Sequence, residues 1–224
     1  AKFSSSSILL SFNCIGELIT SPFSILILTL CENILCKLSM SKITVDEVRF
    51  DNKLSLLWKS WKTLRSKTLY NELSSWNLLE DEKVFSVKWE LQRGSVIEES
   101  EIKEALKVRE QWLDEVNSLF KKFEFLAIPS SQLFPFDKNI AYPNILNGIE
   151  LDSYHKWMEI VTIPSLLGLP VISVPVGFNK KGLPMGMQVI AKKREDLKLL
   201  SFAKRYEELI KASEVKPDLQ KLID

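Results

Sequence analysis

Residues 153–191, SYHKWMEIVTIPSLLGLPVISVPVGFNKKGLPMGMQVIA, decide the fold of this chain. The first half of the stretch predicts a helix over residues 151–167, which the Gly-Leu-Pro sequence at residues 168–170 ends. Within that helix Pro164 predicts a kink or a break, because proline has no backbone N–H to donate to the preceding turn. The stretch therefore begins as a helix and stops sharply.

A strand, a turn and a returning strand follow the helix. Residues 171–176 are rich in β-branched side chains and predict a strand, in which Pro175 is expected near a sheet edge or a bulge because it cannot donate a ladder hydrogen bond. Residues 179–182 carry turn residues, and Gly182 is expected to have a positive φ. Residues 185–191 then pair back antiparallel, so the segment ends in a β-hairpin.

Two amphipathic helices are predicted upstream, over residues 46–73 and 98–123, because apolar residues recur at steps of three and four. Trp58 and Trp61 share one face of the first helix, where we expect them to anchor the core. Gly94 is expected to end a short helix in a left-handed conformation, which a Cβ would disfavour. Each of the two long helices is therefore expected to bury one face.

The start of the second helix has two candidate caps. Ser95 and Glu98 have the spacing of a capping box, and Ser100 is the alternative cap. After this helix, residues 125–129 form a short apolar run that predicts a buried strand, and a helix followed by a strand indicates an α/β layer. A last helix is predicted over residues 195–211. Its inward-facing residues are expected to be Leu197, Leu200, Ala203, Tyr206, Leu209 and Ile210.

Composition argues against several classes of function. The 224 residues are 46% hydrophobic and 26% charged, which is ordinary for a globular domain. Thirty Lys and Arg residues against 29 Asp and Glu residues leave a net charge of +1, so we expect no nucleic-acid and no membrane partner. The apolar run over residues 18–31 is shorter than the roughly 20 residues of a membrane-spanning helix, and we interpret it as a core segment.

The chain contains three cysteines and one histidine, which are candidate metal ligands or nucleophiles. The spacing of Cys14, Cys31 and Cys36 fits neither a paired zinc motif nor an even disulfide framework, so we expect free thiols in a reducing, cytoplasmic compartment. His155 has no second histidine or acidic residue at ligand spacing, and we interpret it as a hydrogen-bonded surface or groove histidine. No metal site and no cofactor are therefore predicted.

The two Gly-Leu-Pro stops with their two strands, GLPVISVPVGF through GLPMGMQ, resemble the C-terminal end of the amidase signature family. The resemblance covers about residues 55–212 and is strongest from Pro129 onward. It implies an α/β fold, a mixed β-sheet with flanking helices that is the C-terminal part of an amidase signature fold. The loop over residues 130–149 resembles the family's connection across the mouth of the active site. Residues 1–45 match nothing in the family, so we divide the chain into an N-terminal segment of unclear origin, residues 1–45, and an amidase-like C-terminal region, residues 46–224.

The resemblance also implies a chemistry, the hydrolysis of carboxamide C–N bonds. The family activates a seryl nucleophile through a second serine and a lysine, because a serine hydroxyl is a poor nucleophile until a neighbouring group takes its proton. These groups lie in a Gly/Ser-rich segment, and the present chain contains no Gly-Gly-Ser-Ser-Gly sequence. Its one dense serine run, residues 4–7, has no glycine. No catalytic residue is therefore predicted.

The C-terminal half of the family contributes walls of the acyl pocket. On that resemblance Trp157, Met158 and Thr162, near the end of the helix that approaches the sheet, are candidate substrate-binding residues. For each of them a plain core role is the alternative.

Two functions are open at this point. The first is the C-terminal portion of an amidase-type hydrolase, which is expected to be inactive alone because the Ser-Ser-Lys catalytic segment is missing, and whose intact enzyme acts on a small-molecule amide. The second is a non-catalytic, amidase-like remnant that binds a partner or a small amide. A second copy of the chain or a missing N-terminal half is the candidate protein partner.

Overall fold

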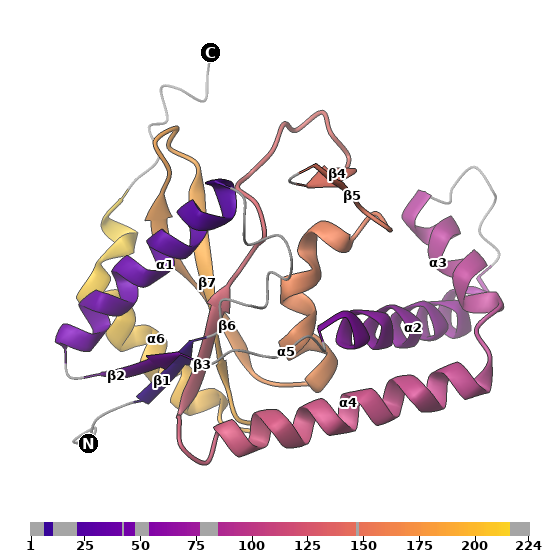
Figure 1. Ribbon diagram of the computed structural model, residues 1–224, viewed down its shortest axis with the longest axis horizontal. Coiled ribbons are helices and arrows are strands. Elements are labelled where there is room, and N and C mark those ends of the chain that lie inside the picture. The colour runs from indigo at the N-terminus through magenta and orange to yellow at the C-terminus, as the bar shows by residue number, and fades with distance from the viewer. Residues whose placement is uncertain are drawn as a thin grey trace.

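The computed structural model describes residues 7–10, 22–41, 43–47, 54–76, 85–146 and 148–215, which form a mixed α/β fold (Figure 1). The central sheet has the strand order β2-β1-β3-β7-β6. Strand β1 runs parallel to β2 and β3, whereas β7 runs antiparallel to both β3 and β6. The expected mixed sheet with flanking helices is therefore confirmed. The strand bounds are β1 Ser7–Leu10, β2 Thr44–Glu47, β3 Phe125–Pro129, β6 Val171–Phe178 and β7 Pro184–Ala191.

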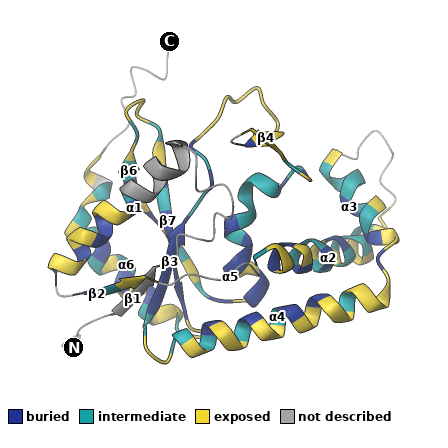
Figure 2. Cartoon of the chain, viewed as in Figure 1, coloured by how far each residue is buried: buried dark blue, intermediate teal, exposed yellow. Residues whose placement is uncertain are grey.

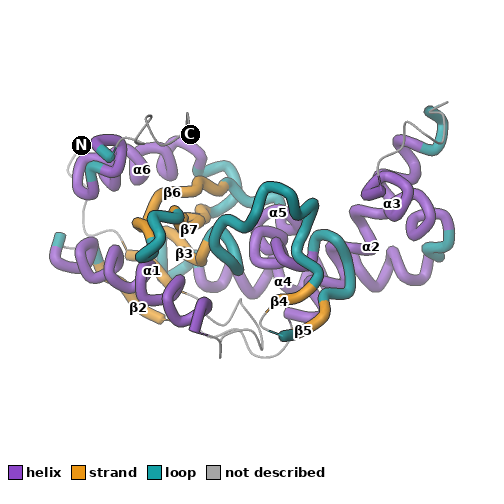
Figure 3. The backbone as a smooth tube through the Cα atoms, turned by 90° about the horizontal axis from the view of Figure 1, so that it is seen from above, coloured by secondary structure: helices purple, strands orange, loops and turns teal. Residues whose placement is uncertain are grey.

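Helices cover both faces of this sheet. The α-helices in the described residues are α1 Pro22–Met40, α2 Leu54–Leu73, α3 Phe85–Ser95, α4 Glu99–Leu119, α5 Thr162–Leu167 and α6 Asp196–Ile210. Helices α1 and α6 pack on one face, and α4 and α5 pack on the other. Helices α2 and α3 lie at the far end of the molecule from α1 and α6 (Figure 3). None of the helices in the described residues is both long and apolar enough to cross a membrane.

Strand β3 lies in the middle of the sheet and is buried on both faces. Phe125 and Ala127 contribute to the core beneath α1 and α6, whereas Leu126 and Ile128 contribute to the core beneath α4 and α5. This alternation follows from strand geometry, because successive side chains point to opposite faces of a sheet. Figure 2 shows β3 and β7 among the buried elements at the centre of the fold. The two cores therefore meet at β3.

The first amphipathic helix begins later than its sequence pattern predicts. Residues 44–47 form strand β2, and α2 begins at Leu54, while residues 48–53 lie outside the described residues. Trp58 and Trp61 do share one face of α2, with their rings stacked at a centroid distance of 5.2 Å. The side chain of Trp58 is buried in the interior, as expected for a core anchor.

The left-handed conformation expected at Gly94 is wrong. Gly94 lies within α3 and does not have a positive φ. A Cβ at this position would lie 2.3 Å from the carbonyl oxygen of Ser66 and 2.5 Å from the Cβ of Tyr70, both on α2. Glycine is therefore needed here because α2 and α3 approach each other closely.

The cap of α4 also differs from both expectations. The N-cap residue is Glu98, not Ser95 or Ser100, and it has extended backbone angles. The backbone N–H of Glu98 donates a hydrogen bond to the carboxylate of Glu101 at 3.2 Å, which closes a capping box. Acidic side chains suit this position, because the first turn of a helix carries a partial positive charge.

The helix predicted over residues 151–167 is shorter and begins as a 3₁₀-helix. This 3₁₀-helix, η3, spans Lys156–Val161, and the chain breaks from helical geometry at Met158, with φ −109° and ψ 19°. Helix α5 follows directly, so Pro164 lies in its first turn, where a missing N–H costs no helical hydrogen bond. The break therefore falls before Pro164. Gly168 ends α5, as predicted, and it has a φ of 64°.

The predicted hairpin is confirmed. Strands β6 and β7 pair antiparallel, and Gly182 in the turn between them has a φ of 76°. Asn179 stabilises this turn, because its Oδ1 accepts hydrogen bonds from the N–H groups of Lys181 at 2.9 Å and Leu183 at 3.0 Å. Pro175 lies at a register shift in β6, which is an edge strand of the described sheet.

Helix α6 buries a different face from the one predicted. Its buried side chains are Leu199, Phe202 and Tyr206, of which only Tyr206 is predicted. Leu197 and Leu200 are instead exposed, with 81% and 58% of their surface accessible. Apolar residues of α6 are spread over more than one face of the helix, so the sequence alone does not define the buried face. The contacts of α6 with β6 and β7 determine which of them are buried.

The turn between β6 and β7 gives a direct test of the hairpin. Gly182→Val should lower the free energy of unfolding by about 1–3 kcal/mol, because a β-branched residue resists a positive φ. Asn179→Ala should cost less, about 1 kcal/mol, because water replaces part of the lost hydrogen bonding in an exposed turn. Equilibrium urea unfolding measures both values, with Lys180→Ala as the exposed control in the same turn. A parent-like midpoint for Gly182→Val would contradict this turn conformation.

Candidate functional site

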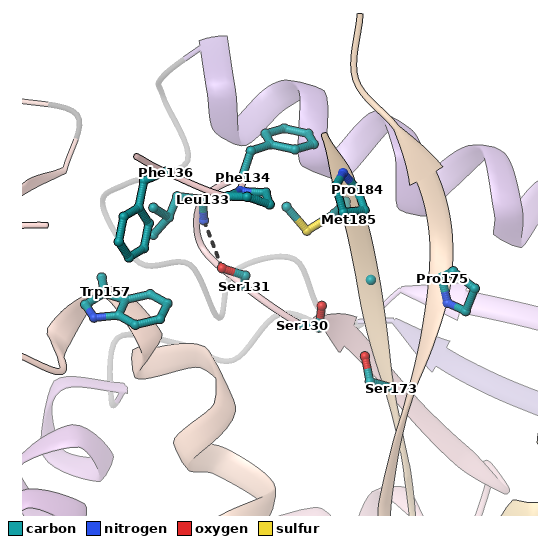
Figure 4. Close-up of a pocket in the computed structure, with 12 residues that line it drawn as sticks. Ser130, Ser131, Leu133, Phe134, Phe136, Trp157, Ser173, Pro175, Pro184 and Met185 are labelled. Atoms are coloured by element: carbon teal, nitrogen blue, oxygen red, sulfur yellow. Dashed lines mark hydrogen bonds between the residues drawn. The ribbon is translucent and has the colours of Figure 1, made fainter. Parts of the chain in front are cut away.

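A cavity of about 520 Å³ opens at the carboxyl end of β3 (Figure 4). Its lining comes from three parts of the chain: the loop over residues 130–136, the β6–β7 hairpin, and Trp157 on η3. The sheet brings the first two parts together, because Pro129 at the end of β3 pairs with Met187 on β7. Residues far apart in the sequence therefore enclose one space.

The floor of this cavity is small and polar. Ser130 follows β3 and Ser173 lies on β6 (Figure 4), and both line the cavity together with Gly186 on β7. A Cβ at Gly186 would lie 2.6 Å from Ser130 Oγ and 3.0 Å from Ser173 Oγ. The backbone N–H of Ser130 also donates to the carbonyl oxygen of Gly186 at 3.0 Å. Glycine is therefore the residue that allows the two hydroxyls to converge at this point.

The walls of the cavity are largely apolar. Phe134 and Met185 are buried on one side, and Phe136 and Trp157 stand on the other. The rings of Phe136 and Trp157 meet edge to face, with a centroid distance of 5.4 Å and an interplanar angle of 82°. Ser131 holds the loop in place, because its Oγ accepts the backbone N–H of Leu133 at 3.3 Å. A few polar groups surrounded by aromatic and aliphatic walls are typical of a small-molecule site.

A second cavity, of about 390 Å³, also has Trp157 in its lining. Its lining includes the aromatic rings of Phe85, Tyr142 and Tyr154, together with Met158. Trp157 lines both cavities and is the residue they share. The two spaces are therefore neighbours.

A buried carboxylate supports the residues behind the second cavity. Glu90, on α3, is 1% exposed and accepts hydrogen bonds from Ser66 Oγ at 2.5 Å, Arg65 Nε at 2.9 Å and Tyr154 Oη at 2.9 Å. The imidazole Nε2 of His155 lies 3.6 Å from Glu90 Oε1. This cluster joins α2, α3 and the segment that leads into η3.

The interpretation of His155 as a surface or groove histidine is wrong. Its side chain is 2% exposed, and its Nδ1 lies 3.0 Å from Ser153 Oγ. The rings that surround it have centroids 4.3–5.2 Å away and belong to Trp58, Trp61, Trp89 and Tyr154. His155 is therefore a core residue, enclosed by aromatic rings from three segments.

Burial alone would raise the pKa of Glu90, but its polar neighbours outweigh that effect. The imidazole of His155 and hydrogen bonds from Ser66, Tyr154 and Arg65 stabilise the carboxylate and lower its pKa to about 2. The same surroundings raise the pKa of Tyr154, chiefly through burial. Glu90 is therefore ionised and Tyr154 is neutral at pH 7.

The three candidate substrate-binding residues differ in whether they line a cavity. Trp157 lines both cavities, and Met158 lines the second. Thr162 is 1% exposed and lines neither, and its hydroxyl donates to the carbonyl oxygen of Glu159 at 2.6 Å. A role in substrate binding is still a prediction for all three residues.

Neither cavity presents a general base among its described lining residues, which are serine, glycine, proline, tyrosine and apolar residues. No group of three or more His, Cys, Asp or Glu side chains in the described part of the chain could hold a metal ion. Cys31 and Cys36 are free, and burial, followed by the charge of Glu32, raises the pKa of Cys31 to about 12. Cys14 and residues 4–6 of the serine run lie outside the described residues. The described lining of the two cavities therefore contains hydroxyl groups but no histidine, lysine, aspartate or glutamate.

Sequence reasoning missed the residues of the cavity floor. Ser130 stands in the predicted loop, and Ser173 stands in the predicted strand, but no local pattern joins them to Gly186. One sequence signal could have helped to find them. Side chains alternate between the two faces of a strand, which places Ser173 and Pro175 on the face of β6 opposite Val174. Which residue of β7 faces them depends on the register, and the register shifts at Pro175.

The sequence model of the Amidase family matches residues 19–200 of the chain. The match includes every residue named above at the two cavities. It begins at residue 19 and so includes part of residues 1–45, whose separate origin is still a prediction.

Individual proteins agree with this match. A glutamyl-tRNA(Gln) amidotransferase subunit of Rickettsia bellii (strain RML369-C) is 34% identical over 121 residues, which are 50% of this chain and 22% of that protein. A bacterial aryl acylamidase of the amidase signature family has the same fold, with a TM-score of 0.77 and 18% identity over 94% of this chain and 44% of its own. The 6-aminohexanoate cyclic dimer hydrolase gives a TM-score of 0.74 and 18% identity over 97% and 48%. The chain thus spans less than half the length of these proteins.

The Glu90 carboxylate predicts a pH dependence of stability. Because folding lowers its pKa from 4.5 to about 2, the unfolded chain binds more protons between these values, and stability falls as the pH falls through this window. The contribution near neutral pH should be on the order of 2 kcal/mol, with allowance for the partly exposed Arg65. Glu90→Gln should lose it, so its deficit relative to the parent should narrow as the pH falls from 4.5 to about 2. Urea unfolding at a series of pH values measures this deficit.

Glu110→Gln, on the exposed side of α4, is the matched control and should follow the parent at every pH. A deficit for Glu90→Gln that stays constant over the whole window would contradict the assigned pKa of Glu90.

Proposed function

The chain belongs to the amidase family, and from that membership we propose that it builds the substrate pocket of a hydrolase that cleaves carboxamide C–N bonds. The observation that carries this proposal is the convergence of the Ser130 and Ser173 hydroxyls near Gly186. A carboxamide offers both a carbonyl acceptor and N–H donors, and a serine hydroxyl can donate and accept. The floor of the first cavity therefore matches the polar half of an amide, and its aromatic walls match an apolar substituent.

We propose that the chain alone does not complete the reaction. Acyl transfer needs a nucleophile beside a base, and donors for the oxyanion. The described cavity supplies hydroxyls without a base, so the reacting serines and lysine would come from the Gly/Ser-rich segment that the family resemblance implies. In this proposal Trp157 and Met158 bind the substrate directly, whereas Thr162 fixes the junction between η3 and α5 through its hydrogen bond to Glu159.

The partner is accordingly proposed to be a small-molecule amide, bound in the cytoplasm, with no cofactor, no nucleic acid and no membrane involved. The near-neutral net charge of +1 supports the exclusion of polyanionic partners.

A non-catalytic function is the second candidate, in which this amidase-like module binds a partner protein or a small amide. Val171 and Phe178 are exposed on the edge strand β6, and Leu197 and Leu200 are exposed on α6. Exposed apolar side chains beside a sheet edge favour association. The partner would be a second copy of the chain or a separate N-terminal half. Size-exclusion chromatography with light scattering decides this point, because a compact monomer would count against an obligate partner.

Removal of one floor hydroxyl tests the proposed amide site. Ser173→Ala should weaken the binding of isobutyramide about fivefold, because a lost hydrogen bond costs roughly 1 kcal/mol. Saturation-transfer NMR on the chain measures this affinity. Ser201→Ala is the matched control, since the Ser201 hydroxyl is exposed and bonds only within its own helix. Isobutyramide that binds both variants equally, or does not bind the parent, would overturn the proposal.

A further inference from the structure

A third cavity, of about 290 Å³, lies between helices α2 and α4, which pack side by side (Figure 1). It shares no described lining residue with the two cavities above. Its volume is at the small end of the roughly 300–1,000 Å³ typical of ligand pockets, so a ligand that fills it is small. Its described lining residues are Leu56, Lys59, Ser60 and Thr63 on α2, and Ser100, Glu101, Glu104, Ala105 and Val108 on α4.

The floor of this cavity carries a hydroxyl group without a hydrogen-bond partner. Ser60 and Thr63 are buried, with 2% and 1% of their surface exposed. Ser60 Oγ donates to the carbonyl oxygen of Ala105 at 2.7 Å, which joins α2 to α4. Thr63 follows about one turn later on α2, and its hydroxyl forms no hydrogen bond with any residue that the structure describes. Because buried polar groups are nearly always hydrogen-bonded, the Thr63 hydroxyl indicates a place where a polar group from outside the chain can bind.

The rim of the cavity carries opposite charges on its two sides. Lys59 lies on α2, Glu101 and Glu104 lie on α4, and all three residues are exposed. The two glutamates are three residues apart, so they share one face of their helix. In the described part of the chain, Lys59 forms no ion pair with either of them. The rim therefore offers one ammonium group and two carboxylates that do not neutralise one another.

Apolar side chains stand beside these charges. Leu56 is 48% exposed, whereas Ala105 and Val108 are buried against the helix pair. A short aliphatic group that covers Leu56 removes apolar surface from water. The cavity therefore suits a small ligand that has an aliphatic part, a cationic group and an anionic group.

We propose that the third cavity binds an aliphatic amino acid in its zwitterionic form. The ammonium group of the ligand pairs with Glu101 and Glu104, its carboxylate pairs with Lys59, and its side chain covers Leu56. The hydroxyl of Thr63 donates to the same carboxylate, which gives this hydroxyl the partner that it lacks. A ligand with only one charge leaves one side of the rim unpaired, and this is the basis of the selectivity.

The experiment compares three probes that share one branched aliphatic body. L-valine carries both charges, isobutylamine lacks the carboxylate, and isovalerate lacks the ammonium group. Saturation-transfer NMR titrations on the full chain at pH 7 measure the three affinities. We expect L-valine to bind about fivefold more tightly than either analogue, because each analogue loses one charged contact at a partly exposed rim.

Two charge variants assign the two sides of the rim. Glu104→Gln should weaken L-valine and isobutylamine and leave isovalerate unchanged. Lys59→Gln should weaken L-valine and isovalerate and leave isobutylamine unchanged. Glu110→Gln and Lys107→Gln are the matched controls, because both residues are exposed on α4 but do not line the cavity, and these variants should bind as the parent does. Circular dichroism checks that all four variants fold.

Three outcomes would overturn the proposal. The first is no binding of L-valine to the parent chain. The second is an affinity for L-valine that does not exceed that for both analogues. The third is a preference for L-valine that survives both Lys59→Gln and Glu104→Gln, which would place the ligand outside this cavity. None of these outcomes bears on the proposed amide site, because the two sites share no residue.

Discussion

The antiparallel pairing of β3 with β7 is the constraint on which the candidate site depends. All five residues of β3 are buried, and its two faces belong to different cores. The pairing extends beyond the strand, because the N–H of Ser130 donates to the carbonyl oxygen of Gly186. That bond places Ser130 beside Gly186 and thus beside Ser173 on the next strand. The polar floor is therefore a continuation of the sheet rather than a feature of a free loop.

A second constraint fixes the aromatic side of the site. Glu90 joins α2 to α3 through Arg65 and Ser66, and it holds the segment before η3 through Tyr154. A buried carboxylate would be costly alone, but several hydrogen bonds compensate for its burial. Tyr154 and His155 of this network come shortly before Trp157 and Met158 in the sequence. Polar interactions therefore hold the segment that carries these apolar wall residues.

The sequence predicts the parts of this fold that local chemistry determines. Gly168 ends its helix, Gly182 has a positive φ, and Pro175 lies at the edge and bulge that a missing donor requires. Gly94 could not be interpreted in the same way, because its role depends on the backbone of Ser66, which is distant in the sequence. The same holds for His155, whose enclosure requires rings from α2 and α3. The two-serine floor depends on strand register, which no single segment encodes. Local signals therefore predict the hairpin, and only the assembled sheet forms the site.

We propose that the described part of this chain supplies an amide pocket whose reacting groups come from another segment. Its most direct test is the release of ammonia from isobutyramide, measured with the chain alone and with the N-terminal part of an amidase added as a separate polypeptide. We expect no ammonia above the blank for the chain alone, and release once the Gly/Ser-rich segment is supplied. Ammonia released by the chain alone, and abolished by Ser130→Ala or Ser173→Ala, would contradict it.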